Sequence, residues 1–326
     1  MKIWRKSLVL AIALLVFGAL RLRFEAELGA GLRAARLIAP RLEVGSRERI
    51  GQTSSAVALG GLRTLVATFL NLRAFTAFSE QRWTDVEQTY QTIVDLAPHT
   101  RYYWETGSWH LAYNAASYYL NESKLPPLRR REAWRSYIGK GRAFLERALR
   151  NNPDDWSLLA SLGMLLTDSN KFVAFRDTQE SFAAAAAAYR KCAATGKAPG
   201  YASRAWLYAL ARVAGKESEA LALARSLDAQ GPKNRTPTLR MLLLVLEAHD
   251  NPSLDVARRA VELFGTPDKA YAALCGHWQR SRDQFPVFGV PAALAALEAA
   301  LAIPQEKSIL GKPLPPPPSP DDWFHN

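Results

Sequence analysis

Residues 201–232, YASRAWLYALARVAGKESEALALARSLDAQGP, decide the fold that the sequence predicts. Apolar side chains recur here at helical spacing in two runs. The runs are Trp206, Leu207 and Leu210, then Ala220, Leu223, Ala224 and Leu227. Gly215 separates the two runs and Pro232 ends the second, as expected for a turn and a helix stop. The stretch therefore predicts a hairpin of two short amphipathic helices.

Similar helix pairs are predicted on both sides of this stretch. They cover residues 59–78 and 82–96, 101–119 and 129–150, 156–168 and 182–194, 238–249 and 254–264, and 267–282 and 291–303. Several pairs end at a proline, such as Pro98 and Pro153. The sequence thus predicts an all-α chain. Because no pair buries its apolar face alone, we expect the pairs to stack on one another.

The phase of these pairs resembles a known repeat family. When Tyr201 is counted as the first position, Leu207, Ala220, Ala224, Leu227 and Pro232 fall where the tetratricopeptide repeat (TPR) has its packing residues and its stop. The resemblance covers residues 54–303. It implies a right-handed α-solenoid of about six helical hairpins. Departures are Arg73, which stands where the repeat usually has Leu, and residues 121–128, which delay the second helix of one unit.

The N-terminus carries an apolar run, SLVLAIALLVFGAL, at residues 7–20, with basic residues on both sides. As a helix this run rises about 21 Å, which is short of the roughly 30 Å hydrocarbon core, but flanking apolar residues can extend it. We predict an uncleaved signal-anchor, a transmembrane helix, at residues 1–24, with a cleaved signal peptide or an interfacial helix as alternatives. Residues 25–53 read as a helical stalk and linker.

The anchor predicts a single-pass membrane protein whose bulk is exported, to the periplasmic side if the protein is bacterial. If the signal is cleaved, the alternative is a secreted protein. At the other end, residues 304–326 predict a Pro-rich extended tail, because KPLPPPPSP cannot continue a helix. The tail ends in Trp323 and Phe324, a motif that could dock in a groove of this protein or of a partner; the alternative is a disordered tail.

The formal net charge of +12 favours an anionic neighbour or a solvated basic face. Arg129, Arg130 and Arg131 form the densest basic patch. This patch supports an alternative function, the binding of a polyanion such as a nucleic acid or an anionic envelope polymer. We do not expect nucleic acid to be the main partner. Cys192 and Cys275, the two cysteines, are predicted to be buried apolar residues rather than a disulfide.

Motifs of catalysis are absent from the sequence. It has no Gly-rich phosphate loop, no His-Glu-x-x-His and no Gly-x-Ser-x-Gly. Cys275 and His277 come nearest to a ligand pair, but no second Cys/His cluster accompanies them. We therefore expect no cofactor, no metal and no enzymatic activity. The alternative is a solenoid-type enzyme whose acidic residues converge only in the fold.

The TPR resemblance also implies a binding surface. In TPR proteins the first helix of each pair lines the concave face through its second, fifth, ninth, twelfth and thirteenth positions. Carried onto this chain, they are Tyr102, Glu105, Trp109, Ala112 and Tyr113, with Asn71, Phe75 and Phe78 from the preceding unit and Met164 and Asp168 from the following one. Trp109 and Tyr113 share a helix face in any register. The alternative is that these aromatic residues pack between helices.

The function predicted from these patterns is a membrane-tethered TPR-like scaffold that binds a protein or peptide partner. Aromatic side chains offer large contact area at low entropic cost, which suits peptide anchoring. Fold-level analogy with such proteins favours an assembly factor of a cell-envelope complex.

Overall fold

The computed structural model describes residues 62–312. Throughout this range the ordered elements are helices, and there is no β-strand, so the prediction of an all-α fold is confirmed there. The predicted anchor at residues 1–24, the stalk and linker at residues 25–53, and the tail motif Trp323 and Phe324 lie outside the described residues. No helix within residues 62–312 has the length and apolar character needed to span a membrane.

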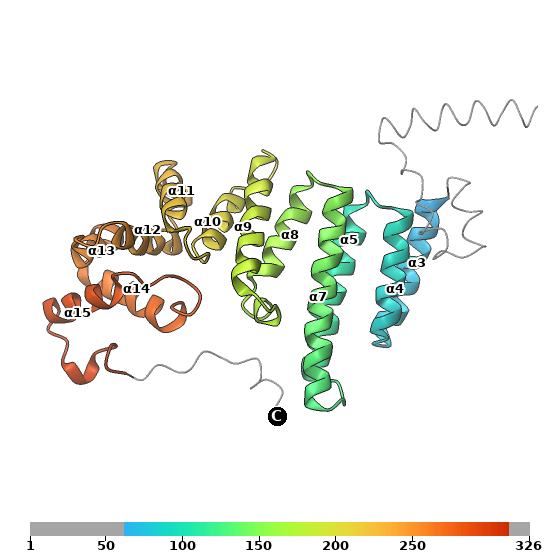
Figure 1. Ribbon diagram of the computed structural model, residues 1–326, viewed down its shortest axis with the longest axis horizontal. Coiled ribbons are helices and arrows are strands. Elements are labelled where there is room, and N and C mark those ends of the chain that lie inside the picture. Colours follow the sequence, from blue (N-terminus) through green and yellow to red (C-terminus); the bar gives the residue numbers. More distant parts are fainter. Residues whose placement is uncertain (1–61, 313–326) are drawn as a thin grey trace, which may run out of the picture. The chain divides into compact units, whose positions relative to one another are not determined.

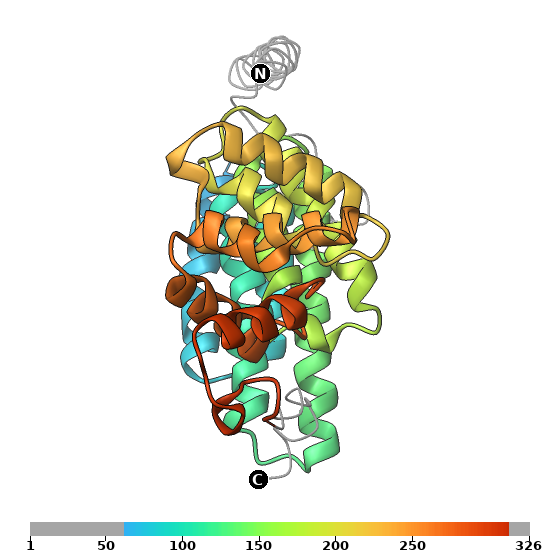
Figure 2. The same cartoon turned by 90° about the vertical axis from the view of Figure 1, so that its left-hand side faces the viewer.

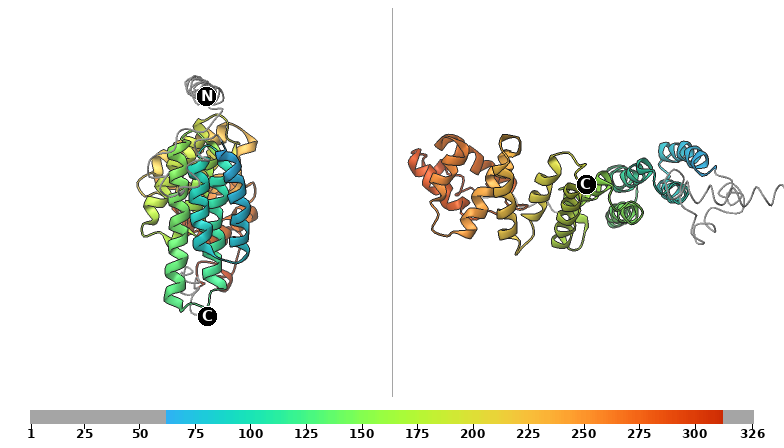
Figure 3. Two further views of the ribbon diagram at one scale, coloured as in Figure 1. Left: turned by 90° about the vertical axis from the view of Figure 1, so that its right-hand side faces the viewer. Right: turned by 90° about the horizontal axis from the view of Figure 1, so that it is seen from above.

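The chain divides into two compact units, residues 1–103 and 104–326. In the described part of the first unit, α3 (Arg63–Ser79) and α4 (Trp83–Leu96) form a hairpin, which Figures 1 and 3 show as two adjacent helices. Gln81 makes the turn between them with a left-handed backbone (φ 57°). One face of α3 is buried against α4. It carries the small side chains Ala67, Ala74 and Ala77, whereas the buried residues of α4 are larger. Within the described residues this pair follows the predicted ranges 59–78 and 82–96, and the predicted start at residue 59 lies outside them.

The second unit continues through helices that follow one another with short connections. They are α5 (Arg101–Trp109, within which the unit begins), the π-helical segment His110–Ala115, α6 (Ala116–Asn121), α7 (Pro127–Asn151), α8 (Trp156–Thr167), the 3-10 turn Phe172–Ala174, α9 (Thr178–Ala194), α10 (Tyr201–Leu210), α11 (Glu217–Ala229), the 3-10 turn Pro232–Asn234, α12 (Pro237–Asp250), α13 (Val256–Phe264), α14 (Pro267–Arg280), α15 (Val290–Ala300) and the 3-10 turn Gln305–Lys307.

Successive helices of the second unit pack side by side (Figure 1). Helix α9 lies between α8 and α10, and α12 lies between α11 and α13. At the C-terminal end the helices form one group, seen in orange and red in Figure 2, in which α14 also contacts α12 and α15 also contacts α13. The large apolar residues of each helix are buried in these contacts, so the core is continuous along the unit rather than central.

Local sequence signals set most helix ends. The carboxylates of Asp155 and Asp177 accept hydrogen bonds from the first backbone N–H groups of α8 and α9, so both are N-caps. Thr236 does the same for α12. Gly215 adopts φ 76° in the turn between α10 and α11, a conformation that glycine reaches without strain. The predicted hairpin at residues 201–232 is therefore present with its predicted turn.

Small residues permit the closest helix contacts. A Cβ atom added to Gly163 of α8 would stand 2.6 Å from the Tyr189 ring of α9. A Cβ on Gly141 of α7 would meet the Cβ of Ala112 at 2.6 Å. The two predicted core cysteines differ, because Cys192 is buried and Cys275 is only half-buried; neither forms a disulfide.

Candidate binding surface

The aromatic cluster of residues 102–119 divides between core and surface. Trp104 is fully buried, with its ring centroid 4.9 Å from that of Phe144 on α7. Tyr119 stacks on Tyr137 of α7 at 5.2 Å. Trp109, by contrast, is 48% exposed. Both predicted possibilities thus occur in one helix, and Trp109 is its exposed aromatic residue within the second unit.

Trp109 stands immediately before the π-helical segment His110–Ala115. Its ring stacks on the Tyr113 ring, with centroids 4.2 Å apart and planes 15° from parallel. A π-helical segment places one extra residue in the turn, and such segments recur at functional sites. Within the segment the Asn114 amide bonds the His110 ring at 2.9 Å. The helix therefore widens where it presents a flat aromatic pair to solvent.

Tyr113 links this pair to the end of α8. Its hydroxyl is buried without a hydrogen-bond partner in ordinary geometry. Burial, together with the negative charge of nearby Asp168, raises the pKa of Tyr113 well above its usual value. The ammonium of Lys171 lies 5.2 Å from the centre of the Tyr113 ring, a cation–π contact. Tyr113 is therefore neutral and lies close to one carboxylate and one ammonium.

Lys171 is buried, with 6% of its surface exposed. Burial lowers its pKa, and the Asp168 carboxylate partly opposes that effect. Backbone hydrogen bonds from Lys171 and Phe172 to the Asp168 carbonyl, both 2.9 Å, fold this connection into a turn. The turn holds the lysine against the aromatic pair, although a lysine side chain ordinarily extends into solvent.

Glu105 fixes the other end of the surface. Its carboxylate accepts a hydrogen bond of 2.5 Å from the Ser157 hydroxyl at the start of α8. Farther along both helices, Tyr113 meets Asp168. Helix α8 therefore runs alongside the helix that starts with α5, and the two point in the same direction. Met164, four residues before Asp168 and 46% exposed, lies on the same face of α8.

A second cation, which is half-buried, lies beyond α8. Arg212, just after α10, donates to the Thr167 carbonyl at 3.2 Å and lies over the rings of Phe182 and Phe285, at 5.1 and 4.3 Å. Burial lowers its pKa to about 10, and no carboxylate of the described chain pairs with it. The end of α8 thus lies near two cations: Lys171, close to the Asp168 carboxylate, and Arg212, on the Thr167 carbonyl. We call Glu105, Trp109, Tyr113, Met164, Asp168 and Lys171 the aromatic–lysine surface.

The predicted site residues of the first unit differ from one another in exposure. Phe75 is 69% exposed and Tyr102 is 56% exposed. Asn71 is half-buried, because its side-chain oxygen accepts a 2.9 Å hydrogen bond from Tyr90. Phe78 is also half-buried and packs edge-on against Trp83, 5.6 Å between centroids. Phe75 and Tyr102 are therefore available for contact, whereas Asn71 and Phe78 serve the α3–α4 hairpin.

One predicted surface position is wrong. Ala112 is fully buried and lies against Gly141 of α7. The TPR register places it on the concave face by counting along a regular α-helix. The π-helical segment adds a residue to the turn, which rotates later positions relative to that count.

The basic patch is less open than its sequence suggests. Arg129 is exposed, but Arg130 and Arg131 are half-buried, and the Arg130 guanidinium lies 3.5 Å from the Leu120 carbonyl. Among residues 62–312, no cluster of His, Cys, Asp and Glu could hold a metal ion. His277, of the possible ligand pair, is buried, its Nε2 lies 2.9 Å from the Pro286 carbonyl, and burial lowers its pKa.

Sequence reasoning missed Lys171 and Arg212. Both lie in or next to connections, where cations are ordinarily solvated and carry no periodic signal. Phe172 and Phe175 next to Lys171 were the available hint, because aromatic residues in an insertion suggest that it folds back on a core.

The chain matches no protein-family model, and no curated protein or solved structure matches it either.

Proposed function

We propose that this chain is a membrane-tethered scaffold of the TPR type that binds a segment of a partner protein through the aromatic–lysine surface. Its helix pairs stack as the right-handed solenoid of about six hairpins that the repeat pattern predicts. Two observations support this arrangement: successive helices pack side by side, and the helix that begins as α5 runs in the direction of α8. First helices of successive TPR units are parallel in this way.

The observation that carries the binding proposal is the exposed Trp109–Tyr113 stack at a π-helical segment. Trp109 is 48% exposed, although burial of an aromatic side chain stabilises a fold. Aromatic residues in this setting are the usual anchors of protein interfaces. Met164 adds an adaptable apolar contact beside them.

The charges indicate what the bound segment carries. Lys171 and Arg212 outnumber Asp168, and neither cation is well solvated. A carboxylate from a partner would replace the interactions with water that these cations lose on burial. We therefore expect a peptide segment in which an acidic residue stands close to an aromatic or aliphatic one.

The membrane tether rests on the apolar run at residues 7–20. A tether confines the binding surface to a thin layer and so raises its effective concentration toward membrane-bound partners. An assembly factor of a cell-envelope complex, exported on the outer side of the membrane, is the role that fits this arrangement. The single-pass orientation and an uncleaved signal-anchor belong to the same proposal.

The test uses the full-length protein in its own membranes. A photo-crosslinking p-benzoyl-phenylalanine replaces Met164, at the edge of the aromatic–lysine surface, and the adducts are identified by mass spectrometry. We expect one or a few partner proteins, each crosslinked through a segment that contains an acidic and an apolar residue. Trp109→Ala in the same protein should reduce the yield of these adducts at least tenfold.

The matched control is Tyr201→Ala, because Tyr201 is also exposed, begins helix α10 and is not part of the surface. This variant should leave the adducts unchanged. Adducts that persist in Trp109→Ala, or that disappear equally in both variants, would show that the aromatic pair does not bind the partner.

A further inference from the structure

Helix α3 presents a large apolar face that no described residue covers. Five of its neighbouring large side chains are more than half exposed: Leu62 at 51%, Leu65 at 52%, Phe69 and Leu72 at 63%, and Phe75 at 69%. Four of them, Leu62, Leu65, Phe69 and Leu72, follow the three-and-four spacing with which one helix packs along another. We call these four the α3 stripe.

The opposite face of α3 is already used. Ala67, Ala74 and Ala77 are buried on the side of α4, so this helix is apolar on two sides. A helix that is apolar on two sides belongs between two layers. An exposed apolar patch of several hundred Å² on a soluble surface marks a contact site. The stripe is therefore a candidate contact site.

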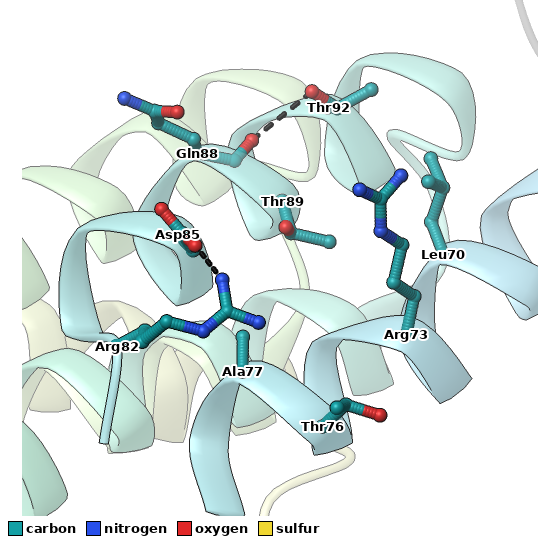
Figure 4. Close-up of a pocket in the computed structure, with 9 residues that line it drawn as sticks. All are labelled: Leu70, Arg73, Thr76, Ala77, Arg82, Asp85, Gln88, Thr89 and Thr92. Carbon is teal, nitrogen blue, oxygen red and sulfur yellow. Dashed lines mark hydrogen bonds and ion pairs between the residues drawn. The ribbon is translucent and has the colours of Figure 1, made fainter. Parts of the chain in front are cut away.

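A polar pocket of about 450 Å³ adjoins the stripe between α3 and α4 (Figure 4). Arg73, four residues after Phe69 and so on the same side of the helix, lines it. Arg73 has no hydrogen bond or ion pair within residues 62–312, whereas Arg82 across the pocket pairs with Asp85 and Glu80. The occupant thus combines an apolar stripe with a carboxylate at its edge. The hydroxyl-lined pocket, with Thr89 and Thr92, suits protein better than lipid chains.

We propose that the α3 stripe is covered by residues 24–39 of the same chain, FEAELGAGLRAARLIA, packed as an amphipathic helix along α3. Phe24, Leu28 and Leu32 recur every four residues and provide the apolar side. Glu25 and Glu27 flank that side and supply a carboxylate for Arg73. Sixteen residues of helix extend about 24 Å, close to the roughly 20 Å from Leu62 to Phe75 along α3.

Length and area favour this segment over a second copy of the chain. Residues 40–61 separate it from the start of the stripe, and a chain of 22 residues has a typical end-to-end distance of about 25 Å, near the length of the helices to be joined. The linked contact needs no bimolecular association. A stable dimer buries about 800 Å² on each partner, which is more than four partly exposed side chains offer. This inference does not depend on the aromatic–lysine surface.

The experiment places p-benzoyl-phenylalanine at Phe69 in the full-length protein, in its own membranes. We expect an intrachain adduct with residues 24–39, at the mobility of a monomer. The matched control carries the same group at Phe75, which is even more exposed but lies about 120° around the α3 axis from Phe69. The control should form little or no adduct with residues 24–39.

Charge exchange gives an independent readout with the Phe69 label in place. Arg73→Glu should lower the intrachain yield about fivefold, and combining it with Glu25→Arg and Glu27→Arg should restore the yield. An adduct between two copies, with lipid or with another protein would overturn the proposal. So would an intrachain yield that ignores the charge exchange, or a Phe75 label that reacts equally well with residues 24–39.

Discussion

Two tryptophans five residues apart in one helix play different parts. Trp104 is fully buried, and the Arg147 guanidinium lies 5.6 Å from its ring centre. Trp109 is half-exposed, and its ring stacks on that of Tyr113. Because the stability of a fold depends on area removed from water, only the first should matter greatly for folding.

The two tryptophans therefore predict opposite results on substitution. Trp104→Ala should lower the free energy of unfolding by about 3–5 kcal/mol, because it leaves a large cavity against Phe144. Trp109→Ala should lower it by about 1 kcal/mol or less. Urea unfolding followed by circular dichroism measures both. A loss of several kcal/mol in Trp109→Ala would assign that residue to the core.

Lys171 predicts a pH dependence with a definite sign. Burial lowers its pKa, so the folded state disfavours the ammonium, and the contribution of Lys171 to stability decreases as the pH falls through its folded pKa. At pH 7 the charged form is a cost. Lys171→Met should then raise the free energy of unfolding at pH 7 by about 1 kcal/mol, with the difference shrinking toward pH 10.5.

The measurement is denaturant unfolding of both proteins at pH 7, 9 and 10. Arg225→Met, with a well-exposed side chain on another helix, serves as the control for loss of a positive charge. If Lys171→Met is destabilised at pH 7 and Arg225→Met is not, the attraction between Lys171 and Asp168 outweighs the cost of burial.

At the scale of elements, the sequence predicts regular features well and irregular ones poorly. The helices at residues 82–96 and 156–168 and the hairpin at residues 201–232 appear close to their predicted bounds, because apolar period, caps and proline or glycine stops are all local signals. Helix α9 begins at Thr178, before its predicted start at residue 182, because Asp177 caps it. The π-helical segment leaves no such signal; within it Ala112 lies against Gly141 of α7, a contact between residues far apart in the sequence.

The π-helical segment is testable by shortening it. Deleting Asn114 should convert His110–Ala115 to a regular α-helix, which turns Trp109 by about 100° relative to the residues that follow. We expect helical content to remain within a few per cent and partner adducts from the Met164 label to disappear. Deleting Ser123 from the loop between α6 and α7 is the matched control. Adducts retained without Asn114 would mean that the wider turn has no part in binding.

At the scale of the whole molecule, the sequence predicts the all-α class and the division into helix pairs, but not which side chains meet. Trp109, Tyr113, Met164 and Asp168 were predicted to line one surface from the repeat register. The structure stacks Trp109 on Tyr113 and brings Tyr113 close to Asp168 and Lys171. Arg212 joins residues more than seventy positions apart, through Thr167 and Gln284. Contacts of that range depend on how every intervening helix turns, and no local pattern records it.

The bridge made by Arg212 has a mechanical consequence. A row of helices that contact only their sequence neighbours extends easily under force, because each helix–helix contact bends independently of the others. Arg212 lies 4.3 Å from the ring of Phe285 and also reaches Thr167, so it ties the loop before α15 to the end of α8. Pulling on α15 should therefore load α8 and α10 together, and the unit should resist extension as one stiff body until that tie breaks.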